Sequence, residues 1–228
     1  GLFGFLVGLA LATAPLLAKP RETYVIGAKN FSEQFILAEL IGDRLERRGY
    51  SVERRDGLGS AVVYRALAAG EIGAYVDYSG TLWANVLARR DVVPRARMLR
   101  ELTSELKRVD GVVVLGPLGF ENAYVMAMQR GRAEALAVGS IADLAGASPG
   151  LTLGADLEFL SRPEWAGLRD AYGLRFRAER SYNPTFMYRA PQSGEADVIS
   201  AFSSDGRMAG QDLVGLARPK GALSAYSA

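Results

Sequence analysis

The chain has 228 residues and a formal net charge of +2; 49% of its residues are apolar and 23% are charged. This is the balance of a folded protein, and the length allows one large domain or two small lobes. The sequence contains no cysteine and no histidine, which excludes thiol and imidazole nucleophiles, histidine bases, haem ligation and zinc sites built from sulfur and nitrogen ligands. Acidic and basic residues are interspersed, so no nucleic-acid partner is indicated. We expect a binding protein without a cofactor rather than an enzyme.

The first eighteen residues carry no charge, and charged residues begin at Lys19. The run is slightly short for a free-standing transmembrane helix and rather long for the hydrophobic region of a signal peptide. Two interpretations of residues 1–20 stay open: a signal peptide, or the last transmembrane span of a longer membrane protein. Both place the rest of the chain in the periplasm or on the extracytoplasmic face of the cytoplasmic membrane.

Short apolar strands alternate with amphipathic helices from Thr23 onward. The first strand, "TYVIGAK", precedes a helix over residues 30–49, with Asn30 and Glu33 spaced as a capping box. Later elements of the first half are a strand near 50–54, a helix opened by the turn "GLGS", a strand "EIGAYVDY", helices over 82–89 and 95–109, and a strand "GVVVLG".

The second half continues the alternation. Its expected elements are a strand "AYVMAM", a helix over 140–147, a strand "LTLGA", one helix "EFLSRPEWAGLRDAYG", and strands near Phe176 and Val198. Alternating strands and helices predict an α/β architecture with mostly parallel sheets flanked by helices.

Two segments echo each other without a gap: "YRALAAGEIGAYVDYS" at 64–79 and "YRAPQSGEADVISAFS" at 188–203. Each reads as a helix, a Gly-Glu turn and a strand whose end presents a ring, Tyr78 in one and Phe202 in the other. Chance can produce so short a match. If it is not chance, two α/β lobes would carry related rings at the strand ends, where ligands of open α/β sheets bind.

The candidate site residues are aromatic and cationic. The rings are Tyr78, Tyr124, Phe202 and Tyr226, and the cations are Lys29 and Arg162. Each ring alone is more often core than ligand site, and Lys29 alone is more often a surface residue. Together they suit a solute with a quaternary ammonium group, attracted to ring faces, and a carboxylate. Such a solute would also need no buried acid in its site.

Several motifs in order resemble the substrate-binding proteins of ABC importers for glycine betaine, proline betaine, carnitine and choline. They are "IGAKNFSEQ", "ALAAGEIGAYVDYSGT", "ENAYVMAM", "EFLSRPEW", "YGL" and "MYRA…GEADVISAFSSDGRM…DLVGL", within residues 24–226. The resemblance implies a two-lobed, type II periplasmic-binding-protein fold that closes on its solute. It also implies an ABC permease as partner, possibly fused upstream.

The resemblance also implies roles for individual residues. An aromatic cage falls on Tyr78, Tyr124, Phe202 and Tyr226, with phenylalanine at 202 where the family has tyrosine. Carboxylate-binding positions fall on Lys29 and Arg162, which favours a zwitterionic betaine over choline. Thr81 and Asn122 complete the expected ligand-binding set.

The expected organisation is lobe one at 21–118 plus 217–228 and lobe two at 119–216. Pro191 should shorten or kink the helix that contains it. Because the family continues beyond the position matched by Tyr226, we expect the C-terminal part of lobe one to be missing from this chain. Two alternatives remain: a carboxylate-pair hydrolase that uses Asp77 or Glu121, and the effector-binding domain of a regulator.

Overall fold

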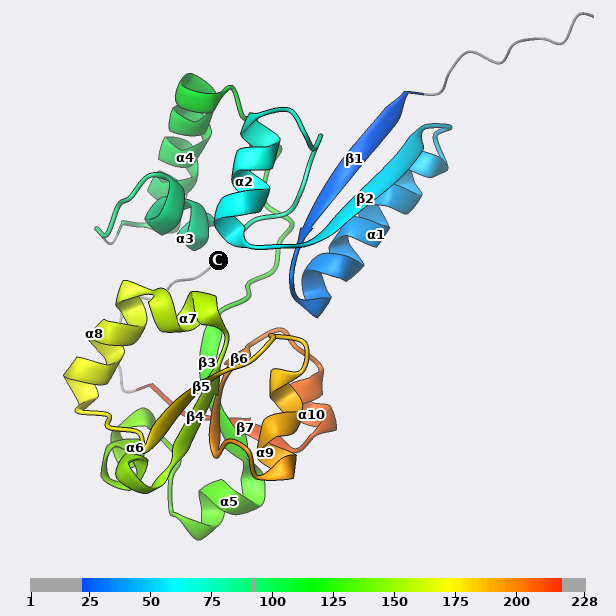
Figure 1. Cartoon of the computed structure of the whole chain (residues 1–228). Helices are drawn as coiled ribbons and strands as arrows, with labels where there is room; N and C mark the ends of the chain where they lie inside the picture. Colours follow the sequence, from blue (N-terminus) through cyan, green and yellow to red (C-terminus); the bar gives the residue numbers. More distant parts are fainter. Residues whose placement is uncertain (1–21, 92, 219–228) are drawn as a thin grey trace, which may run out of the picture.

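Two bodies with a single connection make up the described part of the chain, which in this computed structural model is residues 22–91 and 93–218 (Figure 1). We call residues 22–118 lobe one and residues 119–218 lobe two. Each hydrophobic cluster of described residues lies within one of the two lobes. None of the described helices has the length and apolar character of a transmembrane span. Residues 1–20, predicted to be a signal peptide or a transmembrane span, lie outside the described residues.

Lobe one begins with a strand, a helix and a second strand. Strands β1 (Thr23–Lys29) and β2 (Ser51–Leu58) pair in parallel, and helix α1 (Ser32–Glu46) connects them and packs against both. The last four residues of β1 are buried, which agrees with its continuous apolar run. The predicted capping box at Asn30 is wrong, because α1 begins after Phe31 and Glu33 makes other contacts, described below.

Helices form most of the remainder of lobe one. They are α2 (Ser60–Ala68), which follows the "GLGS" turn as predicted, α3 (Ser79–Thr81), the π-helical turn η1 (Leu82–Val86) and α4 (Arg95–Asp110). The expected strands "EIGAYVDY" and "GVVVLG" are corrected: the first makes only an isolated bridge from Ala74 to Ile26, and residues 111–115 have no regular structure. A strand needs a hydrogen-bonded neighbour, and the described part of this lobe has only two strands.

Lobe two contains a five-stranded sheet in the order β5-β4-β6-β3-β7. The strands are β3 (Tyr124–Gln129), β4 (Thr152–Ala155), β5 (Ala178–Ser181), β6 (Val198–Phe202) and β7 (Leu213–Gly215). Strand β4 runs parallel to β5 and β6, whereas β3 runs antiparallel to β6 and β7. Four of the five strands therefore run in one direction and β3 is reversed, so the sheet is mostly parallel, as expected, with antiparallel pairing at β3.

Short helices surround this sheet. They are α5 (Arg130–Ala135), α6 (Ile141–Ala147), η2 (Ser148–Gly150), α7 (Leu157–Ser161), α8 (Pro163–Tyr172), η3 (Met187–Arg189), α9 (Ala190–Ser193) and α10 (Arg207–Gly210). The single helix expected around Arg162 is broken there, because Pro163 disfavours helical dihedrals at the preceding residue and Arg162 is extended. The short α9 confirms the expected effect of Pro191.

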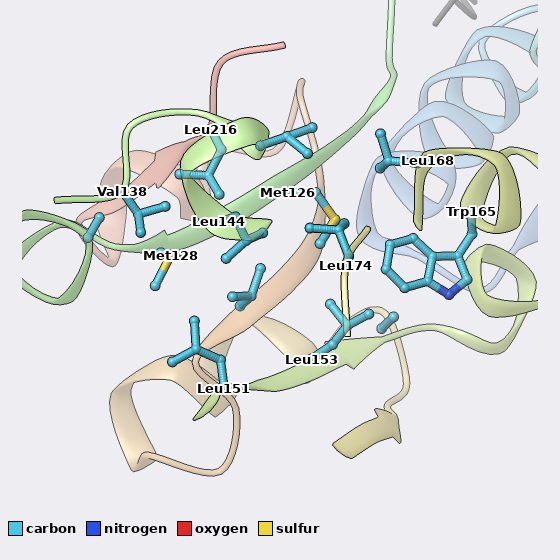
Figure 2. Packing of buried hydrophobic residues seen from close by; sticks show 14 of the residues in the cluster. Met126, Met128, Val138, Leu144, Leu151, Leu153, Trp165, Leu168, Leu174 and Leu216 are labelled. Atoms are coloured by element: carbon cyan, nitrogen blue, oxygen red, sulfur yellow. The ribbon is translucent and has the colours of Figure 1, made fainter. Parts of the chain in front are cut away.

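The main hydrophobic core of lobe two lies beside this sheet. Leucine and methionine side chains from β3, β4, α6 and α8 fill the space beside the sheet, and Trp165 and Leu168 lie at one side of this cluster (Figure 2). Ala217 also stays with lobe two, since its backbone bonds those of Gly139 and Ile141. The boundary expected near residue 217 remains a prediction, because residues 219–228 lie outside the described part.

Gly27 permits close packing inside lobe one. A Cβ atom there would lie 2.5 Å from Ile72 Cδ1 and 3.1 Å from Val63 Cγ2. We expect Gly27→Ala to lower the free energy of unfolding by about 1–2 kcal/mol, because overpacking forces neighbouring groups to shift. Gly167→Ala in α8 is the matched control: its Cβ would meet no described atom within 4 Å, so it should not destabilise. Urea titration of both variants checks this, and equal stability would contradict it.

Candidate solute-binding site

A cavity of about 120 Å³ lies between the lobes. One water molecule needs only roughly 10–15 Å³, so the cavity can hold a small organic solute. Seven of the eight predicted site residues line it: Lys29, Tyr78, Thr81, Asn122, Tyr124, Arg162 and Phe202. The eighth, Tyr226, lies outside the described residues. The structure therefore brings the expected rings of both lobes to one hollow.

Aromatic rings form a continuous row along this cavity. Phe31, at the junction of β1 and α1, stacks on Phe202 at the end of β6, with ring centroids 4.6 Å apart. The Tyr78 ring lies 6.1 Å from Phe31 on the lobe-one side, and the Tyr124 ring lies 5.0 Å from Phe202. Phe159 continues the row, 5.0 Å from Tyr124. Rings from two lobes thus share one apolar surface.

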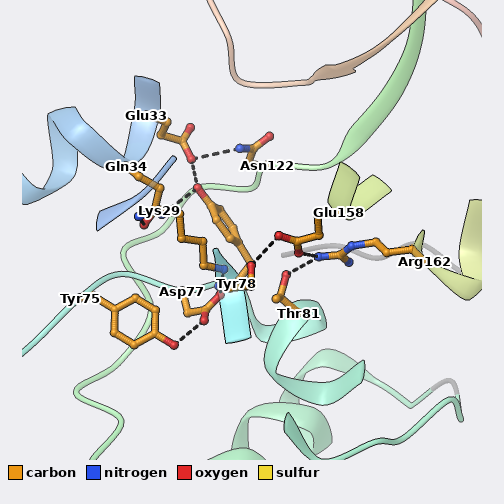
Figure 3. A network of polar contacts seen from close by, with 11 residues as sticks. Lys29, Glu33, Gln34, Tyr75, Asp77, Tyr78, Thr81, Asn122, Glu158 and Arg162 are labelled. Atoms are coloured by element: carbon orange, nitrogen blue, oxygen red, sulfur yellow. Dashed lines mark hydrogen bonds and ion pairs between the residues drawn. The ribbon is translucent and has the colours of Figure 1, made fainter. Parts of the chain in front are cut away.

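Glu33 is the centre of a polar cluster that joins the two lobes (Figure 3). One oxygen of its carboxylate accepts hydrogen bonds from the Tyr78 hydroxyl and, at 3.1 Å, from the amide of Asn122. The other oxygen accepts a hydrogen bond from the Ser204 hydroxyl in lobe two. Burial, together with the bond to Glu33, raises the pKa of Tyr78 above its ordinary value. We call Glu33 and these three partners the Glu33 cluster.

Lys29 is buried at the end of β1 and is neutralised within lobe one. Its ammonium group pairs with Asp77 and lies 5.3 Å from the centroid of the Tyr78 ring. Asp77 also accepts hydrogen bonds from the Tyr75 hydroxyl and, at 2.7 Å, from the backbone N–H of Tyr78. These bonds fix the segment before α3 that presents the Tyr78 ring.

Arg162 makes the second polar link between the lobes. Its guanidinium donates to Thr81 Oγ1 of lobe one at 3.1 Å, pairs with Glu158, and lies 5.5 Å from the Tyr124 ring centroid. Glu158 accepts a further bond, at 2.7 Å, from Ser60 of lobe one. Burial opposes ionisation of Glu158, but the charges of Arg162 and Lys29 outweigh it and hold its pKa below the ordinary value.

Asp156 is a buried acid in the wall of the cavity, which corrects the expectation of a site without one. It caps α7: its Oδ1 accepts from the Phe159 N–H at 3.0 Å and from the Tyr124 hydroxyl at 3.2 Å. Among the described residues, its Oδ2 has no hydrogen-bond partner. Burial raises the pKa of Asp156 above its ordinary value.

Sequence reasoning missed four contributors: Phe31, Glu33, Asp156 and Glu158. Phe31 stands two residues after Lys29, just beyond the first predicted strand. The expectation that rings near strand ends contact the ligand, which was applied to Tyr78, therefore applies to Phe31 as well. Glu158 stands four residues before Arg162, the spacing of helical ion pairs. The contacts of Glu33 with Asn122 and Ser204 span 89 and 171 residues of sequence, and no local pattern predicts them.

Little in this site supports hydrolysis by paired carboxylates. Asp77 is held by Lys29 and Tyr75, and Glu121 pairs with Arg95 at the surface. In the described part of the chain, no cluster of acidic side chains could hold a metal ion. What the arrangement can do is bind: it offers ring faces, a few polar groups and closure between two lobes.

The fold and the cavity define a two-lobed solute-binding domain. A solved structure of a glycine betaine/carnitine/choline ABC transporter superposes with a TM-score of 0.63 at 25% identity, covering 85% of this chain and 73% of that one. The family model for the substrate binding domain of the ABC-type glycine betaine transport system matches residues 22–228. The chain belongs to this family, which consists of transport binding domains rather than enzymes.

Two characterised relatives extend the comparison. A glycine-betaine-binding protein of Pseudomonas aeruginosa is 31% identical over 218 residues, which cover 88% of this chain and 69% of the relative. The ergothioneine transport permease/ergothioneine binding protein EgtU of Helicobacter pylori is 27% identical over 226 residues. That match covers 98% of this chain, which spans 40% of the relative's length.

Proposed function

We propose that this chain is the extracytoplasmic solute receptor of an ABC importer and binds a quaternary-ammonium solute between its lobes. The observation that carries the proposal is the convergence of Phe31 and Tyr78 of lobe one with Tyr124 and Phe202 of lobe two at one cavity. A permanent cation cannot accept hydrogen bonds, and ring faces attract it with roughly 0.5–2 kcal/mol per contact when water is excluded.

The protein's own cations support this assignment. The Lys29 ammonium lies 5.3 Å from the Tyr78 centroid and the Arg162 guanidinium 5.5 Å from the Tyr124 centroid. Both distances fall within the range in which a ring attracts a cation. Rings at this cavity thus attract cations, which is the kind of contact that a methylated ammonium group would make.

The carboxylate of a betaine would meet Lys29 and Arg162, with Thr81 and Asn122 as further polar contacts. Each cation is already paired with an acid, Asp77 or Glu158. A solute carboxylate would thus share them rather than find a free charge. The choice among betaines, carnitine and choline consequently depends on other groups in the cavity.

Closure of the lobes would couple binding to transport. A solute that contacts both lobes favours the closed form by its differential affinity for it, and the closed form would dock on a permease. In the relative EgtU the name joins a permease to a binding protein, and the match covers 98% of this chain, including part of residues 1–21. This supports the interpretation of residues 1–20 as the last permease span, with the binding domain outside the cytoplasm.

Calorimetric titration with glycine betaine, carnitine, choline, ergothioneine and proline tests the proposal. Tyr78→Ala should weaken binding of the preferred solute by at least about 1 kcal/mol, because a ring face is lost. Tyr78→Phe keeps that face and removes only the hydroxyl, which donates to Glu33 and accepts from Gln34, so it should lose less. Unchanged affinity in Tyr78→Ala, or no saturable binding of any methylated ammonium compound, would overturn the proposal.

A further inference from the structure

The cavity extends from the ring row into lobe two. Beyond Tyr124 its walls are apolar and well buried, formed by Met126, Phe159, Trp165 and Leu168. These side chains belong to the main core of lobe two, where Figure 2 labels Met126, Trp165 and Leu168. The cavity therefore reaches the edge of that core. A solute that filled this end of the cavity would need a substituent that extends beyond its trimethylammonium group.

Polar atoms without partners lie among these walls. Asp156 Oδ2, Glu164 Oε2 and Asn122 Oδ1 are buried acceptors, and none has a hydrogen-bond partner among the described residues. All three residues line the cavity. Buried polar groups normally have hydrogen-bond partners, and a missing bond to such a group is destabilising. These acceptors can take a donor from water or from the solute, whereas Arg162 Nε and Trp165 Nε1, also buried at this cavity without a partner in the described part of the chain, would take an acceptor.

Asp156 is the strongest of these acceptors. It is only 5% exposed, and its Oδ1 is already occupied by the Phe159 N–H and the Tyr124 hydroxyl. The Tyr124 ring is also part of the ring row, so the carboxylate sits directly behind a surface that would hold the ammonium group. The nearby cation Arg162 is paired with Glu158 and leaves the Asp156 charge without a partner of its own.

We propose that Asp156 is a specificity residue that selects a methylated-ammonium solute carrying a hydrogen-bond donor, either a hydroxyl or an N–H group. This rests on the proposed function, because the ammonium must occupy the ring row for its substituent to reach Asp156. An ionised carboxylate accepts strongly from such donors and repels a second carboxylate. Glycine betaine has no O–H or N–H group and leaves Asp156 unsatisfied.

The test is calorimetric titration of the full chain with solutes that differ in this group. Choline and carnitine carry a hydroxyl, ergothioneine carries a ring N–H, and glycine betaine and tetramethylammonium carry neither. We expect at least one donor-bearing solute to bind ten times more tightly than glycine betaine. The comparison of choline and carnitine with ergothioneine then shows whether Asp156 binds a hydroxyl or an N–H donor.

Asp156→Asn should reduce that preference for the donor-bearing solute at least tenfold. Asparagine keeps the helix-capping oxygen, and Asp156→Ser is a second capping variant if the first folds poorly. Asp170→Asn is the matched control, since its carboxylate is exposed on α8 and the preference should not change. Thermal unfolding monitors the fold of each variant.

The outcomes separate the two proposals. If glycine betaine binds as tightly as every donor-bearing solute, or if Asp156→Asn leaves the preference intact, the role of Asp156 is overturned while the receptor proposal stands. If no methylated ammonium compound, tetramethylammonium included, binds the wild-type chain, the receptor proposal itself fails.

Discussion

Replacing Tyr124 with alanine should weaken solute binding by about 2–3 kcal/mol, roughly 30-fold to 150-fold, as expected for a central aromatic residue of a binding site. Tyr124 connects the aromatic rings of the site with its polar groups. Its ring contacts Phe202 and Phe159 and faces Arg162, and its hydroxyl bonds Asp156. Truncation removes a ring face and leaves Asp156 with one fewer donor.

Tyr124→Phe separates these contributions. It keeps the ring face and loses only the hydroxyl, so most of the affinity for a simple methylated ammonium compound should return. Stability must be measured alongside affinity, because loss of a buried aromatic side chain typically costs 3–5 kcal/mol of folding free energy. Calorimetry well below the unfolding temperature of both variants gives the comparison. Full affinity in the alanine variant would exclude Tyr124 from the site.

Replacing Glu33 with alanine should shift the lobes toward an open arrangement by about 2–4 kcal/mol. The carboxylate accepts bonds from Tyr78, Asn122 and Ser204, and hydrogen bonds to a charged group contribute about 1.5–3 kcal/mol each. The amide of Asn122, which is buried, would also lose its acceptor. Because only the closed fraction binds productively, the apparent affinity should fall in proportion to the closed population.

Fluorescence energy transfer between the lobes can measure this opening. The sequence contains no cysteine, so Arg44→Cys in α1 and Glu179→Cys in β5 would provide the only labelling sites, both at exposed positions. Glu39→Gln is the matched control, because Glu39 lies on the same helix and pairs with Arg54 within lobe one. Equal transfer efficiency in Glu33→Ala and the control would show that the Glu33 cluster does not hold the lobes together.

The candidate site could be predicted from the sequence to the extent that it depends on strand ends. Rings near predicted strand ends are expected to face a crevice in α/β folds, and Tyr78, Tyr124 and Phe202 all line the cavity. In the structure only Phe202 of these three ends a strand, since Tyr124 begins β3 and Tyr78 precedes α3. The echo of 64–79 with 188–203 also has a structural counterpart: Tyr64 and Tyr188 are both buried, and Gly70 and Gly194 both have positive φ. Local patterns and backbone geometry suffice for such features.

Other expectations failed because they concerned partners distant in the sequence. A capping box at Asn30 and Glu33 satisfied the local spacing, yet Glu33 makes its bonds to lobe two. The segment "EIGAYVDY" has the pattern of a strand, but it forms only an isolated bridge with β1, between Ala74 and Ile26. In lobe two, β3 runs antiparallel to β6 although the elements alternate as in a parallel sheet.

Composition and spacing along the chain are enough to assign the class of this protein. Residue types and their order exclude thiol and imidazole chemistry, predict an α/β fold and mark the ring positions, since these depend on composition and on spacing along the chain. The folded structure was needed to show which charges are paired and that Phe31 belongs to the row of rings. It was also needed to show that Asp156 Oδ2 has no hydrogen-bond partner among the described residues. Those properties depend on burial and on contacts between atoms of opposite lobes. Hydrogen bonds between side chains so distant in the sequence produce no periodic sequence pattern from which they could be predicted.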